Sequence, residues 1–230
     1  MSLHTPRYSA LPFAGRKEAG RLLGEYLKGY LRQFGPSPSD LVVLGLPRGG
    51  VVVASEVAKV IGADLDVLPS RKLGAPSNPE LAIGAVSVAG DPYLSPSAFR
   101  FASEEWIRRE TEAQRARVAQ QIRLFRKSDE YLYLTDKVCV VVDDGTATGA
   151  TALAACNALV QLGAAEVWVA VPVAPPEALG LLDEVADEVF CLAVRADFQA
   201  VGMWYVDFGQ TSDDEVRAIL EEFRRGDEAQ

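Results

Sequence analysis

Two adjacent carboxylates, Asp143 and Asp144, stand between an apolar run and a loop of glycine and threonine. Residues 140–151 read VVVDDGTATGAT, and a helix-forming segment, LAACNALVQLG, follows. An apolar run bounded by turn residues is typical of a buried strand in a parallel sheet. A Gly/Thr loop that opens a helix offers free backbone N–H groups, hydroxyls and the positive end of a helix dipole. These groups together predict a phosphate site.

The loop differs from two common phosphate motifs. The pattern GxxxxGK[ST] is absent, GxGxxG is absent, and the carboxylates precede the loop. Two acids beside a phosphate loop favour a ligand that carries both phosphate and hydroxyl groups, such as a ribose 5-phosphate. The loop would bind the phosphate, and the acids would accept hydrogen bonds from the 2- and 3-hydroxyls. The alternative is an ordinary strand–turn–helix with an acidic strand end.

A second loop of related composition follows the apolar run at residues 41–46. It reads Pro47-Arg48-Gly49-Gly50, and the helical pattern VVVASEVAKVIGA comes directly after it. Glycines let a backbone approach a ligand closely, and an arginine offers a fork of donors suited to phosphate. Strand–loop–helix turns with glycine are common, so this loop predicts a ligand site only in combination with the first.

The elements that must position these loops alternate between strand and helix from residue 41 to residue 194. This alternation predicts an α/β fold, a doubly wound, Rossmann-like parallel sheet with flanking helices. Ligands of such sheets bind outside the carboxyl ends of the strands, where both loops lie. We expect one domain over residues 1–230, with its core at about 41–194.

Two further helices are expected outside this alternation. Residues 16–34 carry apolar side chains at helical spacing, with Arg16 and Lys17 on the solvated side. Residues 97–127 predict a long helical insertion with eight basic and four acidic residues. It is interpreted as a packed helix with a solvated basic face, a subunit interface or a guide for an anionic substrate. Its expected apolar stripe comprises Ile107, Val118, Ile122 and Phe125.

Composition limits the remaining classes of function. The net charge of −9 argues against a general nucleic-acid binder. The N-terminus lacks a secretory pattern and no apolar run reaches membrane length, so we expect a cytoplasmic protein without membrane partners. Cys139, Cys156 and Cys191 lie in apolar segments and are expected to be buried and free. The only histidine, His4, falls in an N-terminal segment expected to be mobile, which leaves Ser-His-Asp and Cys-His catalysis without a base unless it folds back.

Residues 140–151 resemble the motif with which type I phosphoribosyltransferases bind 5-phosphoribosyl 1-pyrophosphate (PRPP). The resemblance implies that Asp143 and Asp144 hold the ribose. It implies that the following loop holds the 5-phosphate. It also implies Mg²⁺ that bridges PRPP oxygens and contacts Asp143 or Asp144 through water, with no site formed by the protein alone. The loop residues concerned are Gly145, Thr146, Ala147, Thr148, Gly149, Ala150 and Thr151.

The second loop and the segment after residue 70 fit the same family. PRGG is similar to the family's pyrophosphate loop, which implies that Pro47, Arg48, Gly49 and Gly50 bind PRPP. The family's flexible loop lies between the second strand and the PRPP motif, and its basic residues neutralise the leaving pyrophosphate. By resemblance, this role falls to Arg71 and Lys72, with residues 73–84 as the closing loop. Asp143, Asp144, Arg48, Arg71 and Lys72 are therefore the candidate catalytic residues.

The chain ends are expected to form a small hood, from the N-terminal segment and residues 195–230. In the family, such a hood covers the acceptor, often by stacking it on an aromatic ring. This implies that Phe198, Trp204 or Tyr205 contacts the acceptor. The alternative is that these aromatic residues only cover the sheet edge.

Over residues 41–215 the chain is similar in particular to bacterial proteins known only as predicted phosphoribosyltransferases. The shared stretches are LPRGG, RKLGAP, NPELAIGA, VVDDGTATGAT and VGxWYxDF. The resemblance implies transfer of the phosphoribosyl group from PRPP to a nitrogen nucleophile, a nucleobase, by a homodimer. Ala147 stands where hypoxanthine-guanine enzymes have an aspartate, which lowers the expectation of a 6-oxopurine acceptor. The alternative is a non-catalytic sensor of PRPP or nucleotides on the same fold.

Overall fold

The computed structural model describes residues 2–6, 10–126 and 134–227. Within these ranges it describes every side chain except those of Glu80 and residues 225–227. Among the described helices, none combines the length and the hydropathy that crossing a membrane requires.

A six-stranded sheet forms the centre of the molecule, and its neighbouring strands all pair in parallel. The strand order is β1-β9-β8-β7-β2-β3. This confirms the predicted parallel α/β sheet. The strands are β1 (Ser2–His4), β2 (Leu41–Gly45), β3 (Asp64–Val67), β7 (Val138–Val142), β8 (Glu166–Ala174) and β9 (Glu188–Val194).

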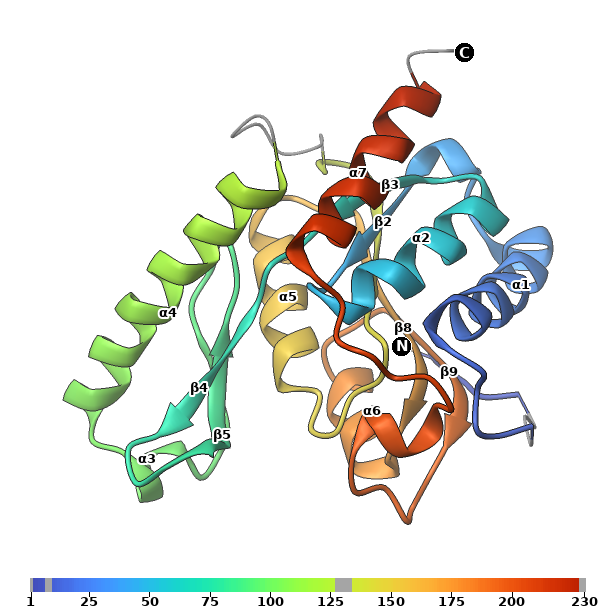
Figure 1. Cartoon of the computed structure of the whole chain (residues 1–230). Helices are drawn as coiled ribbons and strands as arrows, with labels where there is room; N and C mark the ends of the chain where they lie inside the picture. The colour runs from blue at the N-terminus through green and yellow to red at the C-terminus, as the bar shows by residue number, and fades with distance from the viewer. Residues whose placement is uncertain (1, 7–9, 127–133, 228–230) are drawn as a thin grey trace.

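Helices cover both faces of this sheet, as Figure 1 shows. Alternate residues of β7 enter opposite cores: Val140 and Val142 pack with α1 and α2, whereas Cys139 and Val141 pack with α5 and α6. This two-sided burial explains why the strand is apolar throughout and does not alternate. The helices are α1 (Arg16–Phe34), α2 (Gly49–Ile61), α5 (Ala150–Gln161), α6 (Pro176–Asp183) and α7 (Asp213–Asp227), and the 3₁₀ turns are η1 (Pro38–Asp40) and η2 (Val201–Trp204).

A second, antiparallel sheet stands beside the first and was not predicted as such. It consists of β4 (Arg71–Ala75), β5 (Asn78–Val86) and β6 (Tyr93–Leu94). Residues 73–84, which the resemblance assigns to the closing loop, therefore lie largely within the strands β4 and β5, and the closing role stays a prediction. Leu73 and Ile83 point into a buried cluster shared with the following helices, and this burial outweighs the turn propensity of the Gly and Pro residues.

The helical insertion packs on this hairpin as two helices, α3 (Ala98–Phe101) and α4 (Glu104–Phe125). Ala102 ends the first, and Ser103 caps the second, because its side chain accepts a hydrogen bond from the Trp106 N–H. Residue 127, the predicted end, lies outside the described residues. Most of the predicted apolar stripe faces the hairpin, with Ile107 and Val118 buried there and Ile122 partly buried. Phe125, at the end of α4, is buried in the core of the main sheet instead.

The two ends of the chain lie together against the main sheet. The expectation of a mobile His4 was wrong, because β1 pairs with β9 and His4 Nε2 lies 2.6 Å from Glu188 Oε2. Farther along, the Phe13 N–H donates to the Trp204 carbonyl and the Val206 N–H donates to the Phe13 carbonyl. Both contacts join residues about two hundred positions apart, so only the complete fold could reveal them.

Candidate active site

The two predicted ligand loops emerge from adjacent strand ends. β2 and β7 are neighbours, with Gly45 paired to Val142, and the Leu46 N–H donates to the Val142 carbonyl over 2.9 Å. The peptide bond between Pro47 and Arg48 is cis. The parallel register thus brings residues 47–50 and residues 143–151 to the same carboxyl-end edge of the sheet.

Gly49 and Gly50 pack directly against the carboxylate pair. A Cβ atom on Gly49 would lie 2.0 Å from Asp144 Oδ2, and one on Gly50 would lie 2.8 Å from Asp143 Oδ1. The sequence predicted that these glycines allow close approach to a ligand. In the structure, the close approach that requires glycine is to Asp143 and Asp144 themselves.

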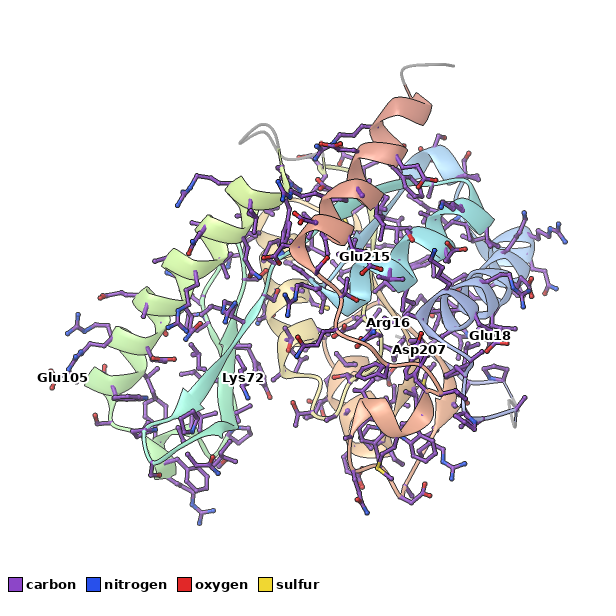
Figure 2. All side chains as sticks on the ribbon, viewed as in Figure 1. Arg16, Glu18, Lys72, Glu105, Asp207 and Glu215 are labelled. Atoms are coloured by element: carbon purple, nitrogen blue, oxygen red, sulfur yellow. The ribbon has the colours of Figure 1, made fainter. Side chains whose placement is uncertain are left out.

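A cavity of about 460 Å³ opens at this edge. Its walls come from both predicted loops, from the hairpin and from α4, so the insertion contributes to the site. Figure 2 shows Lys72 on the side of the hairpin that faces α5, whereas Glu105 lies on the outer side of α4. The lining residues with charged or polar side chains include Arg71, Lys72, Glu110, Gln114, Arg117, Gln121, Asp143 and Thr151, and Pro47 also lines the cavity.

Asp143 and Asp144 have different partners. Asp143 lines the cavity, and its Oδ1 accepts a hydrogen bond from the Asp144 N–H. Asp144 is turned to the start of α1, where its Oδ2 accepts from Arg16 Nε over 2.7 Å. Of the two carboxylates, only Asp143 is among the residues that line the cavity, and the role of Asp144 in holding the ribose stays a prediction.

The pKa values of Asp143 and Asp144 reflect their burial and their charged neighbours. Burial and then the charge of Asp144 raise the pKa of Asp143 well above its usual range. Burial also raises the pKa of Asp144, an effect that the hydrogen bond and the charge of Arg16 oppose. Asp143 carries this raised pKa and lines the cavity. Such a carboxylate favours a ligand that donates hydrogen bonds from hydroxyl groups or that brings a cation.

The loop after the carboxylates opens α5 through a left-handed residue, Gly149 at φ +73°. Thr146 is buried, its N–H donates to the Val173 carbonyl, and its hydroxyl accepts from the Gly149 N–H. Thr146 thus shapes the loop, although the sequence assigned it to the ligand. A Cβ on Gly145 would lie 2.8 Å from Val201, so this glycine is required by packing as well.

The rest of this loop remains open to a phosphate. Ala147 and Thr148 are exposed, and Thr151 in the first turn of α5 lines the cavity. Ala150, the first residue of α5, is buried, and its N–H donates to the Thr148 hydroxyl over 3.4 Å. Thr148, Thr151 and the helix N-terminus are the groups that can bind an anion here.

Arg48 does not line the cavity. Its guanidinium is 3.8 Å from Asp213 at the start of α7, with 43% of the side chain exposed. Arg48 is thus directed toward α7 in this arrangement, and its contact with a phosphate stays a prediction. Pro47 itself is the residue of this loop that reaches the cavity.

The aromatic residues predicted to stack an acceptor are mostly buried. Tyr205 is 5% exposed and its hydroxyl donates to the Asp144 carbonyl over 2.5 Å. Trp204 is 9% exposed, with the Arg195 guanidinium 4.5 Å from its ring centre. Phe198 is partly buried, 6.3 Å from the Trp204 ring. Trp204 and Tyr205 therefore pack mainly against the protein, and a contact of Phe198, Trp204 or Tyr205 with an acceptor stays a prediction.

Two parts of this site were missed from the sequence. Arg16 was placed on a solvated helix face, yet it is 13% exposed, binds Asp144 and donates to the Gly209 carbonyl. No local signal identifies such a contact across 128 residues. For α4, the sequence left open a solvated face, a subunit interface or a guide for an anionic substrate, and it did not single out Glu110, Gln114 and Arg117, which recur at helical spacing and line the cavity.

A smaller cavity of about 330 Å³ lies on the other side of Arg16, between the chain ends. Figure 2 shows Arg16, Asp207 and Glu215 near one another around it. Its other lining residues include Lys17 and Thr211. This cavity combines both signs of charge in the region where the hood was expected.

Comparisons with known proteins agree with this geometry. A family model described as the phosphoribosyl transferase domain matches residues 16–207. A Mycobacterium tuberculosis protein, recorded for two strains under the name "Putative phosphoribosyl transferase", is 44% identical over 218 residues, 93% of this chain. The chain spans about half the length of these curated relatives, 47%.

A solved structure is similar over nearly its whole length. The crystal structure of TT1426 from Thermus thermophilus shares 45% sequence identity and has a TM-score of 0.77. The match covers 93% of this chain and 99% of that one. Together with the family model and the paired loops at one edge of the sheet, these similarities show that the chain belongs to the phosphoribosyl transferase domain family.

Proposed function

We propose that the chain transfers the 5-phosphoribosyl group of PRPP to a nitrogen nucleophile, a nucleobase, and releases pyrophosphate. One observation carries this proposal: Asp143, Thr151, Arg71 and Lys72 line the same cavity, at the edge where the two loops meet. They supply the acceptors, hydroxyl donors and cations that a ribose with a phosphate at each end requires.

The geometry supports a division of labour among these residues. Thr148, Thr151 and the N-terminus of α5 bind the 5-phosphate. Asp143 accepts hydrogen bonds from the ribose hydroxyls. Arg71 and Lys72, which line the same cavity from the hairpin, neutralise the pyrophosphate.

The reaction needs no nucleophile from the protein. The bond between the anomeric carbon and the pyrophosphate oxygen breaks, and its electron pair leaves with pyrophosphate. The nitrogen lone pair forms the new bond to this carbon, and the nitrogen then gives a proton to water. The Asp143 carboxylate favours the positive charge that develops on the ribose. The buried cysteines agree with this scheme, because burial raises the pKa of the Cys139, Cys156 and Cys191 thiols to about 12.

The residues present fit Mg²⁺ bound mainly through the substrate. The described residues hold no cluster of three or more His, Cys, Asp or Glu side chains that could form a metal site without a ligand. Asp143 offers an oxygen to a hydrated ion, whereas Asp144 Oδ2 is engaged by Arg16. When bound, the ion would neutralise charge on the pyrophosphate.

The test is release of pyrophosphate from PRPP and Mg²⁺ across a panel of nucleobases and amines, with PRPP affinity measured by calorimetry. The proposal expects PRPP binding and acceptor-dependent release with at least one member of the panel. Binding of PRPP without release for any acceptor would favour a sensor on the same fold. Absence of PRPP binding would overturn both.

A further inference from the structure

Helix α4 holds a fixed position beside the candidate site. At its end, the side chain of Arg126 is buried and pairs with Asp66 on β3. Along its length, Ile107 and Val118 pack into the cluster under the hairpin. The helix is therefore anchored both to the main sheet and to the hairpin that carries Arg71.

One face of this helix forms a wall of the larger cavity. Glu110, Gln114, Arg117 and Gln121 all line it, at a spacing of three and four residues. The family's loops account for the opposite wall. The α4 residues have no role in the mechanism so far, although they face the same space as Arg71.

Gln114 connects the helix to Arg71. Its Oε1 accepts a hydrogen bond from Arg71 Nε over 2.9 Å, and its Nε2 donates to Glu110 Oε1 over 2.7 Å. Gln114 is 7% exposed, so these bonds are shielded from water. Because this contact uses Nε, the terminal nitrogens of Arg71 keep their donors for a ligand.

Arg117 lies one helical turn from Gln114 and faces the same cavity. Burial, and then the charge of Arg117, lower the pKa of Arg71, which places the two guanidinium groups within electrostatic reach. Glu110, the α4 carboxylate in the cavity wall, is engaged by Gln114. Two cations held near each other form an unfavourable pair that a polyanion between them would turn into a favourable triad.

We propose that Arg117 of α4 binds the pyrophosphate of PRPP together with Arg71, and that Gln114 is a positioning residue that orients Arg71 toward it. This inference rests on the proposed function and adds a ligand-binding element that the two family loops do not contain. The insertion is then part of the donor site, in place of the solvated face expected from the sequence.

The experiment compares Arg117→Gln with Arg123→Gln, an equal loss of charge at an exposed α4 residue that does not line the cavity. Calorimetry with Mg²⁺ measures the affinity for PRPP, inorganic pyrophosphate and ribose 5-phosphate. Arg117→Gln should weaken PRPP and pyrophosphate by about tenfold or more, because a charge-assisted bond is lost. Ribose 5-phosphate should change by less than about twofold, since it lacks the pyrophosphate that Arg117 would bind and its phosphate is assigned to Thr148, Thr151 and the N-terminus of α5. Arg123→Gln should match the wild type for all three.

Unchanged affinity of Arg117→Gln for PRPP and pyrophosphate would overturn this inference and leave the proposed function standing. An equal loss for ribose 5-phosphate would overturn the assignment to the pyrophosphate end. If the wild type binds none of the three ligands, the proposed function fails first and this inference fails with it. Arg117 is exposed, so thermal unfolding of the variant should match the wild type.

Gln114 is tested by a double-mutant cycle with Arg71. Gln114→Ala should weaken pyrophosphate binding in the wild type but have little further effect in Arg71→Gln, because its role acts through Arg71. A merely structural Gln114 would give the same loss in both backgrounds, which would contradict the positioning role.

Discussion

Asp143 and Asp144 are neighbours in the chain but act in different directions. Asp143 faces the cavity beside Thr151, whereas Asp144 binds Arg16 behind it. Asp143 therefore lines the cavity at some cost in stability. Asp144, through its ion pair with Arg16, fixes the loop to α1. Two predictions belong to this scale.

The first prediction concerns Asp143→Asn. Because the pKa of Asp143 is raised in the fold, the native state binds its proton more tightly than the unfolded chain. The free energy of unfolding then falls as the pH rises from the unfolded pKa through the folded one. Above that window the variant should be more stable than the wild type by about 1 kcal/mol, and it should lose PRPP binding. Urea unfolding near pH 8 and calorimetry measure the two effects.

The control for this experiment is Asp91→Asn, at an exposed position away from both cavities. It should change neither stability nor PRPP affinity. A destabilised Asp143→Asn protein near pH 8, or one that still binds PRPP as tightly as the wild type, would contradict the role given to Asp143.

The second prediction concerns Arg16→Gln. It leaves the Asp144 carboxylate without its cation, and we expect a loss of about 1–3 kcal/mol near pH 8. The ion pair stabilises the fold only while Asp144 is ionised, and burial raises the pKa of this carboxyl. The loss should therefore shrink as the pH falls toward about 5. Equal losses at both pH values, measured by urea unfolding, would assign the effect to the Gly209 contact and not to the ion pair.

At the scale of elements, the hairpin and α4 form one unit beside the main sheet. Figure 1 shows α4 running along β4 and β5, with the end of the helix directed toward the main sheet. The buried pair between Arg126 and Asp66 joins α4 to β3, and burial raises the pKa of Asp66 despite the opposing charge of Arg126. The position of the α4 residues that line the cavity depends on this pair between Arg126 and Asp66.

The third prediction concerns Arg126→Met. It leaves the buried Asp66 without its cation, and we expect a loss of about 3–5 kcal/mol in the free energy of unfolding. The double variant with Asp66→Asn should recover part of this loss, because the remaining amide is neutral and can still accept the Val67 N–H. Arg123→Met, an exposed change on the same helix, serves as the control. A double variant less stable than Arg126→Met would rule out an unpaired charge as the cause.

At the scale of the whole molecule, segments near both ends of the chain meet beside the loop that holds Asp143 and Asp144. Phe13 pairs with residues 204–206, and the Tyr205 hydroxyl reaches the Asp144 carbonyl. Burial and the charge of Asp144 raise the pKa of Tyr205, so the hydroxyl stays protonated and remains a donor. Through this hydrogen bond, the segment around Tyr205 supports the loop at Asp144.

The fourth prediction concerns Tyr205→Phe. It keeps the buried ring and removes one hydrogen bond to a backbone carbonyl, so the free energy of unfolding should fall by about 1 kcal/mol. Tyr93→Phe is the matched control, because the partly buried Tyr93 hydroxyl has no hydrogen-bond partner among the described residues. Equal unfolding midpoints for Tyr205→Phe and the wild type would show that the tail contributes nothing through this bond.

The sequence by itself determined the parallel sheet, the loop that opens α5 and the resemblance of residues 140–151 to the family. These features are local: an apolar run such as residues 138–142 can only be satisfied as a strand buried on both faces, and Gly149 supplies the left-handed residue that starts α5. The sequence also predicted that both loops lie at one edge of the sheet, because the carboxyl ends of parallel strands meet there.

Only the tertiary structure decided which side chains face the ligand cavity. Asp144 faces Arg16 and Arg48 faces α7, while Arg117 from a helix interpreted as solvated lines the cavity. Tyr205, a candidate for contact with the acceptor, is buried and donates a hydrogen bond to the Asp144 carbonyl. The physical reason is that a side chain binds the partner that the packed elements bring to it, and such partners lie up to 128 residues away for Asp144. Local pattern fixes where a strand ends, but long-range packing fixes which of its neighbouring side chains remain free for chemistry.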